Sequence, residues 1–174
     1  MKSIKILVIR SAARVFNTTL ASLKEEFPDS KVTVLAPESV VDPLLKDPMV
    51  DEVLPLKNQK RISLLNYGLE NMLHLRNRKF DIAVSVYNIE QGIGYSNVDF
   101  IAWMSGADQI RGYNCKNGFV TLTSACILKK YFREKISIIW IVINFFATVI
   151  LLSLITIGMI FESGFRKLFK QAVH

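Results

Sequence analysis

The stretch that decides the organisation of this chain is 136–161, ISIIWIVINFFATVILLSLITIGMIF, which contains no Asp, Glu, Lys, Arg or His. About 20 consecutive apolar residues are enough to cross the hydrocarbon core of a bilayer, and a helix of this length is roughly 39 Å long. The alternative is a buried helix inside a soluble body, but such helices rarely exceed about 20 residues and usually keep a polar face. We therefore predict a C-terminal transmembrane helix.

Basic residues flank this stretch on both sides, where their long side chains can reach lipid headgroups. They are Lys129, Lys130, Arg133 and Lys135 before it, and Arg166, Lys167 and Lys170 after it. Under the positive-inside rule, this small difference in charge favours the N-terminal part of the chain on the cytoplasmic side, but it is too small to fix the orientation. We expect a single-pass protein with membrane lipid as a partner.

The remaining residues divide into three further segments. The chain has 174 residues, so the part before the apolar stretch is long enough for one soluble domain. We expect this domain over 1–115, a basic amphipathic connector over 116–135, and a basic amphipathic tail over 162–174. The mixture of apolar and basic residues in the connector is typical of a helix lying on a membrane surface.

Composition and charge exclude several kinds of site. The net charge of +7 is spread along the chain, which favours anionic lipid headgroups or phosphate-bearing ligands. No dense Lys/Arg block with interleaved aromatic residues occurs, so we expect no nucleic-acid partner. The cysteines, Cys115 and Cys126, and the histidines, His74 and His174, do not have the spacing of a metal site. We therefore expect no metal and no cofactor.

In the N-terminal domain, short apolar runs rich in β-branched residues alternate with helical patterns. This alternation predicts an α/β fold with right-handed βαβ units and a Rossmann-like parallel sheet. We expect Asn17 or Thr18 to cap the first helix. The expected strands are 3–10, 31–36, 50–54, 81–87 and 109–113, and the expected helices are 17–27, 40–46, 62–75 and 98–105.

Ligands of parallel sheets bind beyond the carboxyl ends of the strands, so the loops that follow the strands are candidate sites. Arg10 and Arg14 lie on either side of the loop between the first strand and the first helix. Cations beside the free N–H groups of a helix can bind phosphate or carboxylate. The alternative is that both arginines are solvated loop charges. Gly92 and Gly94 lie in QGIGYS, which lacks the full G-x-G-x-x-G pattern and favours a plain loop.

Five short motifs then occur in a recognisable order: FPD at 27–29, PMVDEV at 48–53, FDI at 80–82, SGA at 105–107 and RGY at 111–113. Together they resemble the N-terminal half of family 9 glycosyltransferases, the heptosyltransferases of lipopolysaccharide core synthesis, over about residues 3–114. The resemblance implies one GT-B-type half that takes the acceptor, while a C-terminal domain binds the nucleotide sugar. It also implies a bacterial inner membrane and a lipid-linked saccharide acceptor.

Two features depart from that family. The apolar stretch occupies the place where the donor-binding domain would begin, and the loop 10–17, RSAARVFN, lacks the family's glycines and its Asp, the presumed general base. Arg14 cannot replace this base because a guanidinium stays protonated, whereas a base must lie about 2.6–3.2 Å from the acceptor hydroxyl. We therefore expect no catalytic residue, and a ligand-binding edge that carries positive but no negative groups.

We expect acceptor binding at this loop and at the end of the fourth strand, where Ser85 and Tyr87 replace the family's Asp and Gln. The candidate acceptor- or anion-binding residues are Arg10, Ser11, Arg14, Asn17, Thr18, Ser85 and Tyr87. Three interpretations stay open: a glycosyltransferase-like protein that needs a partner chain for the donor domain, a non-catalytic membrane-bound binding or scaffold protein, and a truncated gene product.

Overall fold

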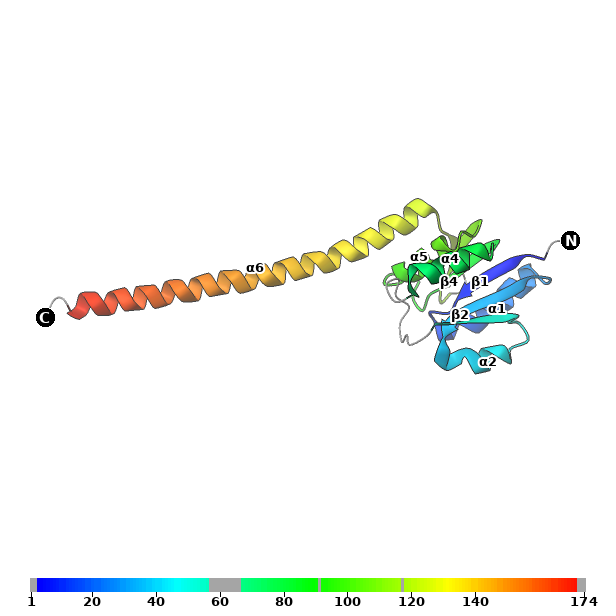
Figure 1. Cartoon of the computed structure of the whole chain (residues 1–174), viewed down its shortest axis with the longest axis horizontal. Helices are drawn as coiled ribbons and strands as arrows, with labels where there is room; N and C mark the ends of the chain where they lie inside the picture. The colour runs from blue at the N-terminus through cyan, green and yellow to red at the C-terminus, as the bar shows by residue number, and fades with distance from the viewer. Residues whose placement is uncertain (1–2, 57–66, 91, 117, 172–174) are drawn as a thin grey trace. The chain divides into compact units, whose positions relative to one another are not determined.

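A computed structural model of the chain describes residues 3–56, 67–90, 92–116 and 118–171. The chain divides into two compact units, Met1–Phe132 and Arg133–His174. The first unit is an α/β domain, and the second continues the long helix α6, Ser124–Gln171, which begins in the first unit. Figure 1 shows the strands of the domain with helices on both sides of the sheet.

The domain is built on a six-stranded sheet with the order β3-β2-β1-β4-β5-β6. All neighbours pair in parallel except β5 and β6, which are antiparallel. The predicted α/β fold with a mostly parallel sheet is therefore confirmed. The strands are β1 Lys5–Ile9, β2 Lys31–Pro37, β3 Glu52–Leu56, β4 Ile82–Val86, β5 Gln109–Tyr113 and β6 Phe119–Thr121.

Helices cover both faces of the sheet, which explains why the central strands read as continuous apolar runs. Alternate residues of β1 contribute to two separate cores. Ile6 and Val8 pack with residues of α1 and α2, whereas Leu7 and Ile9 pack with residues of α4, α5 and the start of α6. The helices are α1 Ala13–Glu26, the 3-10 turn Glu38–Val40, α2 Val41–Leu45, α4 Leu69–Asn77 and α5 Ser96–Met104.

Helix α1 begins earlier than we predicted. It starts at Ala13, so Asn17 and Thr18 lie inside the helix and neither of them caps it, and the predicted caps are wrong. The physical reason is burial: Val15 and Phe16 are 5% and 1% exposed, and a helical first turn brings both into the core. The predicted helix 62–75 begins in residues 57–66, which the structure does not describe. Within the described residues it corresponds to α4.

The C-terminal part of the chain contains elements that the sequence pattern did not indicate. Residues 119–121 form an edge strand that the sequence pattern did not indicate. Helix α6 then runs without a break across the predicted boundaries at 135 and 161. Its first turns belong to the domain, because Ile127 is 1% exposed and lies in the core beside α4 and α5.

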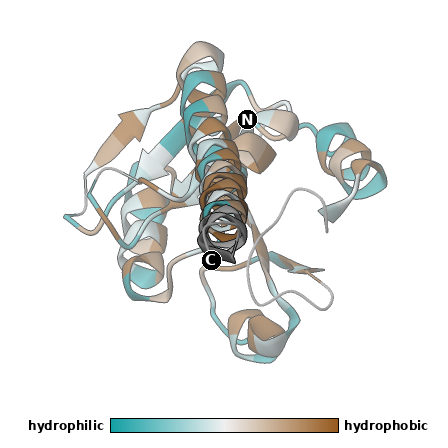
Figure 2. Cartoon of the chain, turned by 90° about the vertical axis from the view of Figure 1, so that its left-hand side faces the viewer, coloured by the Kyte–Doolittle hydropathy of each residue, from teal (hydrophilic) through white to brown (hydrophobic). Residues whose placement is uncertain are grey.

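Among the described residues, one segment, Ser124–Glu162, is long and apolar enough to cross a membrane by length and composition. Its most apolar part is not buried against any other described part of the chain. Ile150 and Leu151, for example, are 60% and 59% exposed, and Figure 2 shows the hydrophobic colour along much of this helix. The location of the helix in a membrane stays a prediction.

Candidate functional site

The strands β1 to β5 end along one side of the sheet, which we call the carboxyl edge. The loops that leave β1, β2 and β4 on this side begin at Arg10, Glu38 and Tyr87. The opposite side, where the same strands begin, is the amino edge. Because ligand sites of such sheets lie at the carboxyl edge, these three loops contain the candidate site.

Arg10 is held at this edge by its backbone. Its N–H donates to the carbonyl oxygen of Leu35 at 2.9 Å, one residue beyond the end of β1. The guanidinium carbon lies 5.4 Å from the centroid of the Phe16 ring, and Nε is buried without a hydrogen bond to any described group. Burial lowers the pKa of Arg10 from its ordinary value, yet a guanidinium remains charged at neutral pH.

Arg14 lies in the first turn of α1 and is exposed. This turn contains no acidic residue, and Ala12 at the cap position provides no side-chain hydrogen bond. The first N–H groups of α1 therefore lack a side-chain cap among the described residues. An uncapped helix N-terminus carries partial positive charge. Together with Arg10 and Arg14 it makes this loop suited to an anion.

The other candidates of the first loop have local partners. Ser11 Oγ donates to the carbonyl oxygen of Val86, which ties the loop to the end of β4. Thr18 Oγ1 donates to the carbonyl oxygen of Val15 at 2.9 Å, so its hydroxyl is turned onto its own helix. Asn17 is exposed in the second turn of α1. None of these contacts adds a charge to the anion site.

Tyr87, Asp99 and Lys130 form a buried polar cluster behind the carboxyl edge. The Tyr87 hydroxyl donates to Asp99 Oδ1, and Lys130 Nζ donates to Asp99 Oδ2 at 2.5 Å. The Asp99 and Lys130 side chains are only 1% and 14% exposed. Lys130 Nζ also lies 4.9 Å from the centroid of the Tyr87 ring. Burial raises the pKa of Tyr87, and the Asp99 carboxylate raises it further, so the phenol stays a neutral donor.

Ser85 lies close to this cluster at the end of β4. It is fully buried, and its Oγ has no hydrogen-bond partner in the described part of the chain. Tyr87 is 5% exposed. The structure therefore brings the two candidates of the fourth strand together, but it places both inside the domain.

The expectation of an edge without negative groups is wrong. Asp99 lies directly behind this edge, and Glu38 and Glu90 are exposed on the loops that follow β2 and β4. Glu90 pairs with Lys116 Nζ at 2.9 Å. Sequence reasoning missed Asp99 because it reads as one residue of an ordinary helix. The available signal was a single carboxylate within the apolar run VDFIAW.

Gly92 allows the backbone to pack closely against Tyr87 and Lys130 of the buried polar cluster. Its φ is +61°, and a Cβ at this position would lie 2.9 Å from Tyr87 Cε2 and 3.1 Å from Lys130 Nζ. Only glycine avoids both the steric cost of this φ and the close contact. The plain-loop interpretation of QGIGYS therefore has a structural explanation.

Comparison with known proteins bears on the fold. No protein-family model and no curated protein matches the chain. The structure is similar to that of ADP-heptose LPS heptosyltransferase II of E. coli, with a TM-score of 0.50 and 19% identity over 63% of this chain and 30% of that chain. The domain has a heptosyltransferase-like fold. A family 9 glycosyl transferase of Veillonella parvula aligns with a TM-score of 0.46 and 18% identity, over 66% of this chain and 33% of that chain.

The chain thus spans about a third of the length of these proteins. At this level of identity the similarity extends to the fold alone.

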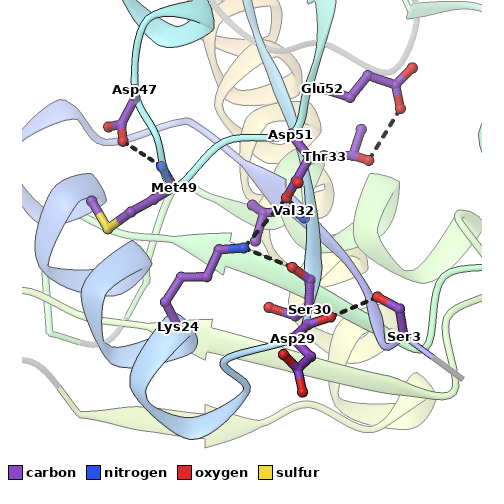
Figure 3. Close-up of polar contacts among 10 residues, drawn as sticks. All are labelled: Ser3, Lys24, Asp29, Ser30, Val32, Thr33, Asp47, Met49, Asp51 and Glu52. Carbon is purple, nitrogen blue, oxygen red and sulfur yellow. Dashed lines mark hydrogen bonds and ion pairs between the residues drawn. The ribbon is translucent and has the colours of Figure 1, made fainter. Parts of the chain in front are cut away.

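Two aspartates in the motifs that resemble family 9 stabilise the heptosyltransferase-like fold at the amino edge. Asp51 Oδ2 accepts a hydrogen bond from the Val32 backbone N–H at 2.7 Å, at the start of β2, and one from Lys24 Nζ at 3.4 Å (Figure 3). Asp81 Oδ2 likewise accepts from the Lys5 N–H at 2.7 Å, at the start of β1. Each carboxylate accepts a backbone N–H in the first two residues of a strand. These aspartates therefore account for strand pairing and not for chemistry at the carboxyl edge.

Glu52 has a similar structural role. Arg78 Nη1 donates to Glu52 Oε1 at 2.6 Å, and Thr33 Oγ1 donates to Oε2 at 3.3 Å. Figure 3 shows Asp51 and Glu52 in separate networks. The two neighbouring acids are thus engaged with different partners, as expected of residues that do not act as a catalytic pair.

We expect Asp51→Ala to lower the free energy of unfolding by about 1–3 kcal/mol, because it leaves the Val32 N–H without its acceptor. The measurement is urea unfolding of the detergent-solubilised full chain, followed by Trp103 fluorescence in a Trp140→Phe background. Asp108→Ala is the control, because Asp108 is exposed at the amino edge and the structure gives it no hydrogen bond to a described group. Equal effects of the two changes would contradict the role assigned to Asp51.

Proposed function

We propose that this protein is a membrane-anchored, glycosyltransferase-like protein that binds a phosphorylated, lipid-linked saccharide at its carboxyl edge and does not transfer sugar on its own. The observation that carries the proposal is the uncapped N-terminus of α1, which lies between Arg10 and Arg14 and has no acidic residue in its first turn. The heptosyltransferase-like fold and the apolar helix α6 are consistent with a lipid-linked ligand of this kind.

The physical basis of binding is electrostatic. A phosphate at a helix N-terminus accepts hydrogen bonds from backbone N–H groups that point toward it. A nearby guanidinium adds charge-assisted hydrogen bonds, which are about twice as strong as neutral ones. Arg14 is exposed and can move toward a ligand, whereas Arg10 is partly buried and held by its backbone. The loop therefore combines one fixed and one adaptable cation.

Two carboxylates near the carboxyl edge are engaged with other described residues and so are not available as a base. Asp99 is buried and bonded to Tyr87 and Lys130, so it does not reach an acceptor hydroxyl at the surface. Glu90 is paired with Lys116. Glu38, exposed directly after β2, is the carboxylate that an active form would use as base. Transfer would in addition require a nucleotide-sugar site, whether in this chain or in a partner.

In this proposal, α6 anchors the chain in a bacterial inner membrane and the domain faces the cytoplasm. The support is the length and apolar composition of α6, together with basic residues on both sides of its apolar stretch. This arrangement would keep the domain next to membrane-embedded glycolipids.

The test is binding of two probes to the detergent-solubilised full chain, measured by titration calorimetry. We expect a lipid A-type phosphoglycolipid to bind and ADP-heptose not to bind. Arg14→Gln should weaken glycolipid binding about tenfold or more, because a hydrogen bond to a charged group contributes about 1.5–3 kcal/mol. Arg76→Gln, which removes an equally exposed arginine from α4, should leave binding unchanged.

Two results would contradict the proposal. Unchanged glycolipid binding by Arg14→Gln would contradict the proposed binding site. Sugar transfer by the purified chain would contradict the proposed lack of autonomous activity. If transfer occurs, its loss in Glu38→Gln would identify the base. Absence of binding to both probes would favour the second candidate function, a scaffold protein, which is consistent with the apolar side chains of α6 that no described residue covers.

A further inference from the structure

The first unit ends at the carboxyl edge of its own sheet. Helix α6 begins next to the end of α5, where Trp103 Nε1 donates to Ser124 Oγ at 3.0 Å. Two turns later, Lys130 lies beside Tyr87, the residue that follows β4. The start of α6 thus runs from the amino edge to the carboxyl edge, and the chain leaves the domain there, at Phe132.

The length of the connection limits how far this edge can lie from the apolar stretch. Ile136, the first residue of that stretch, lies six positions after Lys130. Even fully extended, six residues span at most about 22 Å. Whatever the arrangement of the two units, the carboxyl edge near Lys130 therefore remains close to the point where the apolar stretch begins.

Exposed apolar side chains lie on this edge. Ile89 and Ile93, in the loop between β4 and α5, are 41% and 56% exposed. Phe119, opposite Tyr113 at the end of β5, is 46% exposed, and Phe132 is 57% exposed. Single exposed apolar residues are common on soluble domains. Here they accompany the exit of an apolar helix, and this continuity distinguishes them from scattered residues such as Leu45.

The loop between β4 and α5 is anchored from within, so the exposure of its isoleucines is built into the fold. Gly92 packs against Tyr87. The Tyr95 and Tyr87 rings lie 5.3 Å apart, and the Asn88 N–H donates to the Tyr95 hydroxyl at 3.3 Å. The buried residues on both sides of Ile89 and Ile93 therefore hold these side chains at the surface.

Cations accompany the apolar residues at the same edge. Arg14 and Lys129 are exposed in the domain, and Arg133 and Lys135 follow before the apolar stretch. Apolar side chains next to lysine and arginine are typical of surfaces that contact anionic headgroups. Of the exposed carboxylates at this edge, Glu90 is paired with Lys116 and Glu38 is outnumbered by these cations, so the edge still suits an anionic lipid surface.

We propose that the carboxyl edge lies against the headgroup region of an anionic bilayer, with Ile89 and Ile93 inserted among the lipids. This inference rests on the proposed membrane anchoring by α6. It assigns the lipid-facing surface of the domain, and it makes the Arg10–Arg14 loop open toward membrane glycolipids.

The experiment uses the full chain with Cys115→Ser and Cys126→Ser, and a single new cysteine that carries a bimane fluorophore. Ile93→Cys reports on the carboxyl edge, and Asp108→Cys is the control at the amino edge. The chain is reconstituted into vesicles of equal parts phosphatidylcholine and phosphatidylglycerol. Lipid-attached nitroxide and aqueous iodide are the two quenchers, and flotation of the vesicles reports anchoring separately.

We expect the label at position 93 to be quenched several-fold more by lipid nitroxide, and several-fold less by iodide, than the label at 108. Equal quenching of the two labels in a chain that floats would overturn the inference while leaving anchoring intact. Failure of the chain to float with the vesicles would overturn both the membrane anchoring and the inference. Equal shielding in vesicles of phosphatidylcholine alone would remove the role of anionic lipid. Shielding of the label in native membranes, but not in vesicles that contain this chain as their only protein, would assign the edge to a protein partner and overturn the inference.

Discussion

Asp99→Asn is expected to lower the free energy of unfolding of the domain by about 3–5 kcal/mol, because removing one member of a buried ion pair leaves the other charge without a partner. Lys130 Nζ lies 2.5 Å from Asp99 Oδ2, and its side chain is 14% exposed. The Tyr87 hydroxyl loses its charged acceptor in the same change. Urea unfolding followed by Trp103 fluorescence, in the Trp140→Phe background, measures the loss.

An exposed pair provides the matched control. Glu90→Gln breaks the pair with Lys116, whose side chains are 57% and 68% exposed, and should cost less than about 1 kcal/mol. Combining Asp99→Asn with Lys130→Met should recover part of the loss, since no unpaired charge then remains buried. A loss for Asp99→Asn no larger than that for Glu90→Gln would show that water reaches the Asp99–Lys130 pair.

Gly112→Ala is expected to lower the free energy of unfolding by about 1–3 kcal/mol through overpacking. A Cβ at Gly112 would lie 2.5 Å from Tyr87 Cε2 and 2.6 Å from the Tyr87 hydroxyl oxygen. Tyr87 cannot move aside without disturbing its hydrogen bond to Asp99 and its contact with Lys130. The same urea unfolding experiment measures the change.

Gly118→Ala is the control for this substitution. A Cβ at Gly118 would meet only the side chain of Asn114, at 3.7 and 3.8 Å, which is ordinary contact. The change should therefore stay within about 0.5 kcal/mol. Similar small effects at both glycines would mean that the Tyr87 ring has free space nearby, which would contradict the packing described for the cluster.

Both predictions concern the contact between the start of α6 and the sheet. Ile127 is buried in the core, and Lys130 is bonded to Asp99. The helix that carries the apolar stretch is therefore part of the domain up to this point. Weakening the Tyr87–Asp99–Lys130 cluster should loosen the connection between the carboxyl edge and α6, on which the proposed placement at the membrane depends.

The resemblance of the sequence motifs to family 9 glycosyltransferases has a structural explanation, which concerns the fold and not the chemistry. Asp51 and Asp81, in two of the motifs that resemble the family, accept hydrogen bonds from Val32, the second residue of β2, and from Lys5, the first residue of β1. Shared motifs of this kind specify the fold at the amino edge. Asp51 and Asp81 carry no information about the anion-binding loop at the carboxyl edge, where the proposed function depends on Arg10, Arg14 and the N-terminus of α1.

By itself, the sequence determined the apolar stretch and the alternation of strands and helices, including β5 at Gln109–Tyr113. Both follow from local hydrophobic patterns, which report which segments are buried. Only the tertiary structure decided that α1 starts at Ala13 and that β6 pairs with β5. It also decided that Asp99 meets Tyr87 and Lys130, which lie 12 and 31 positions away. A local pattern shows that a residue is buried, but packing between distant segments selects the partner it meets there.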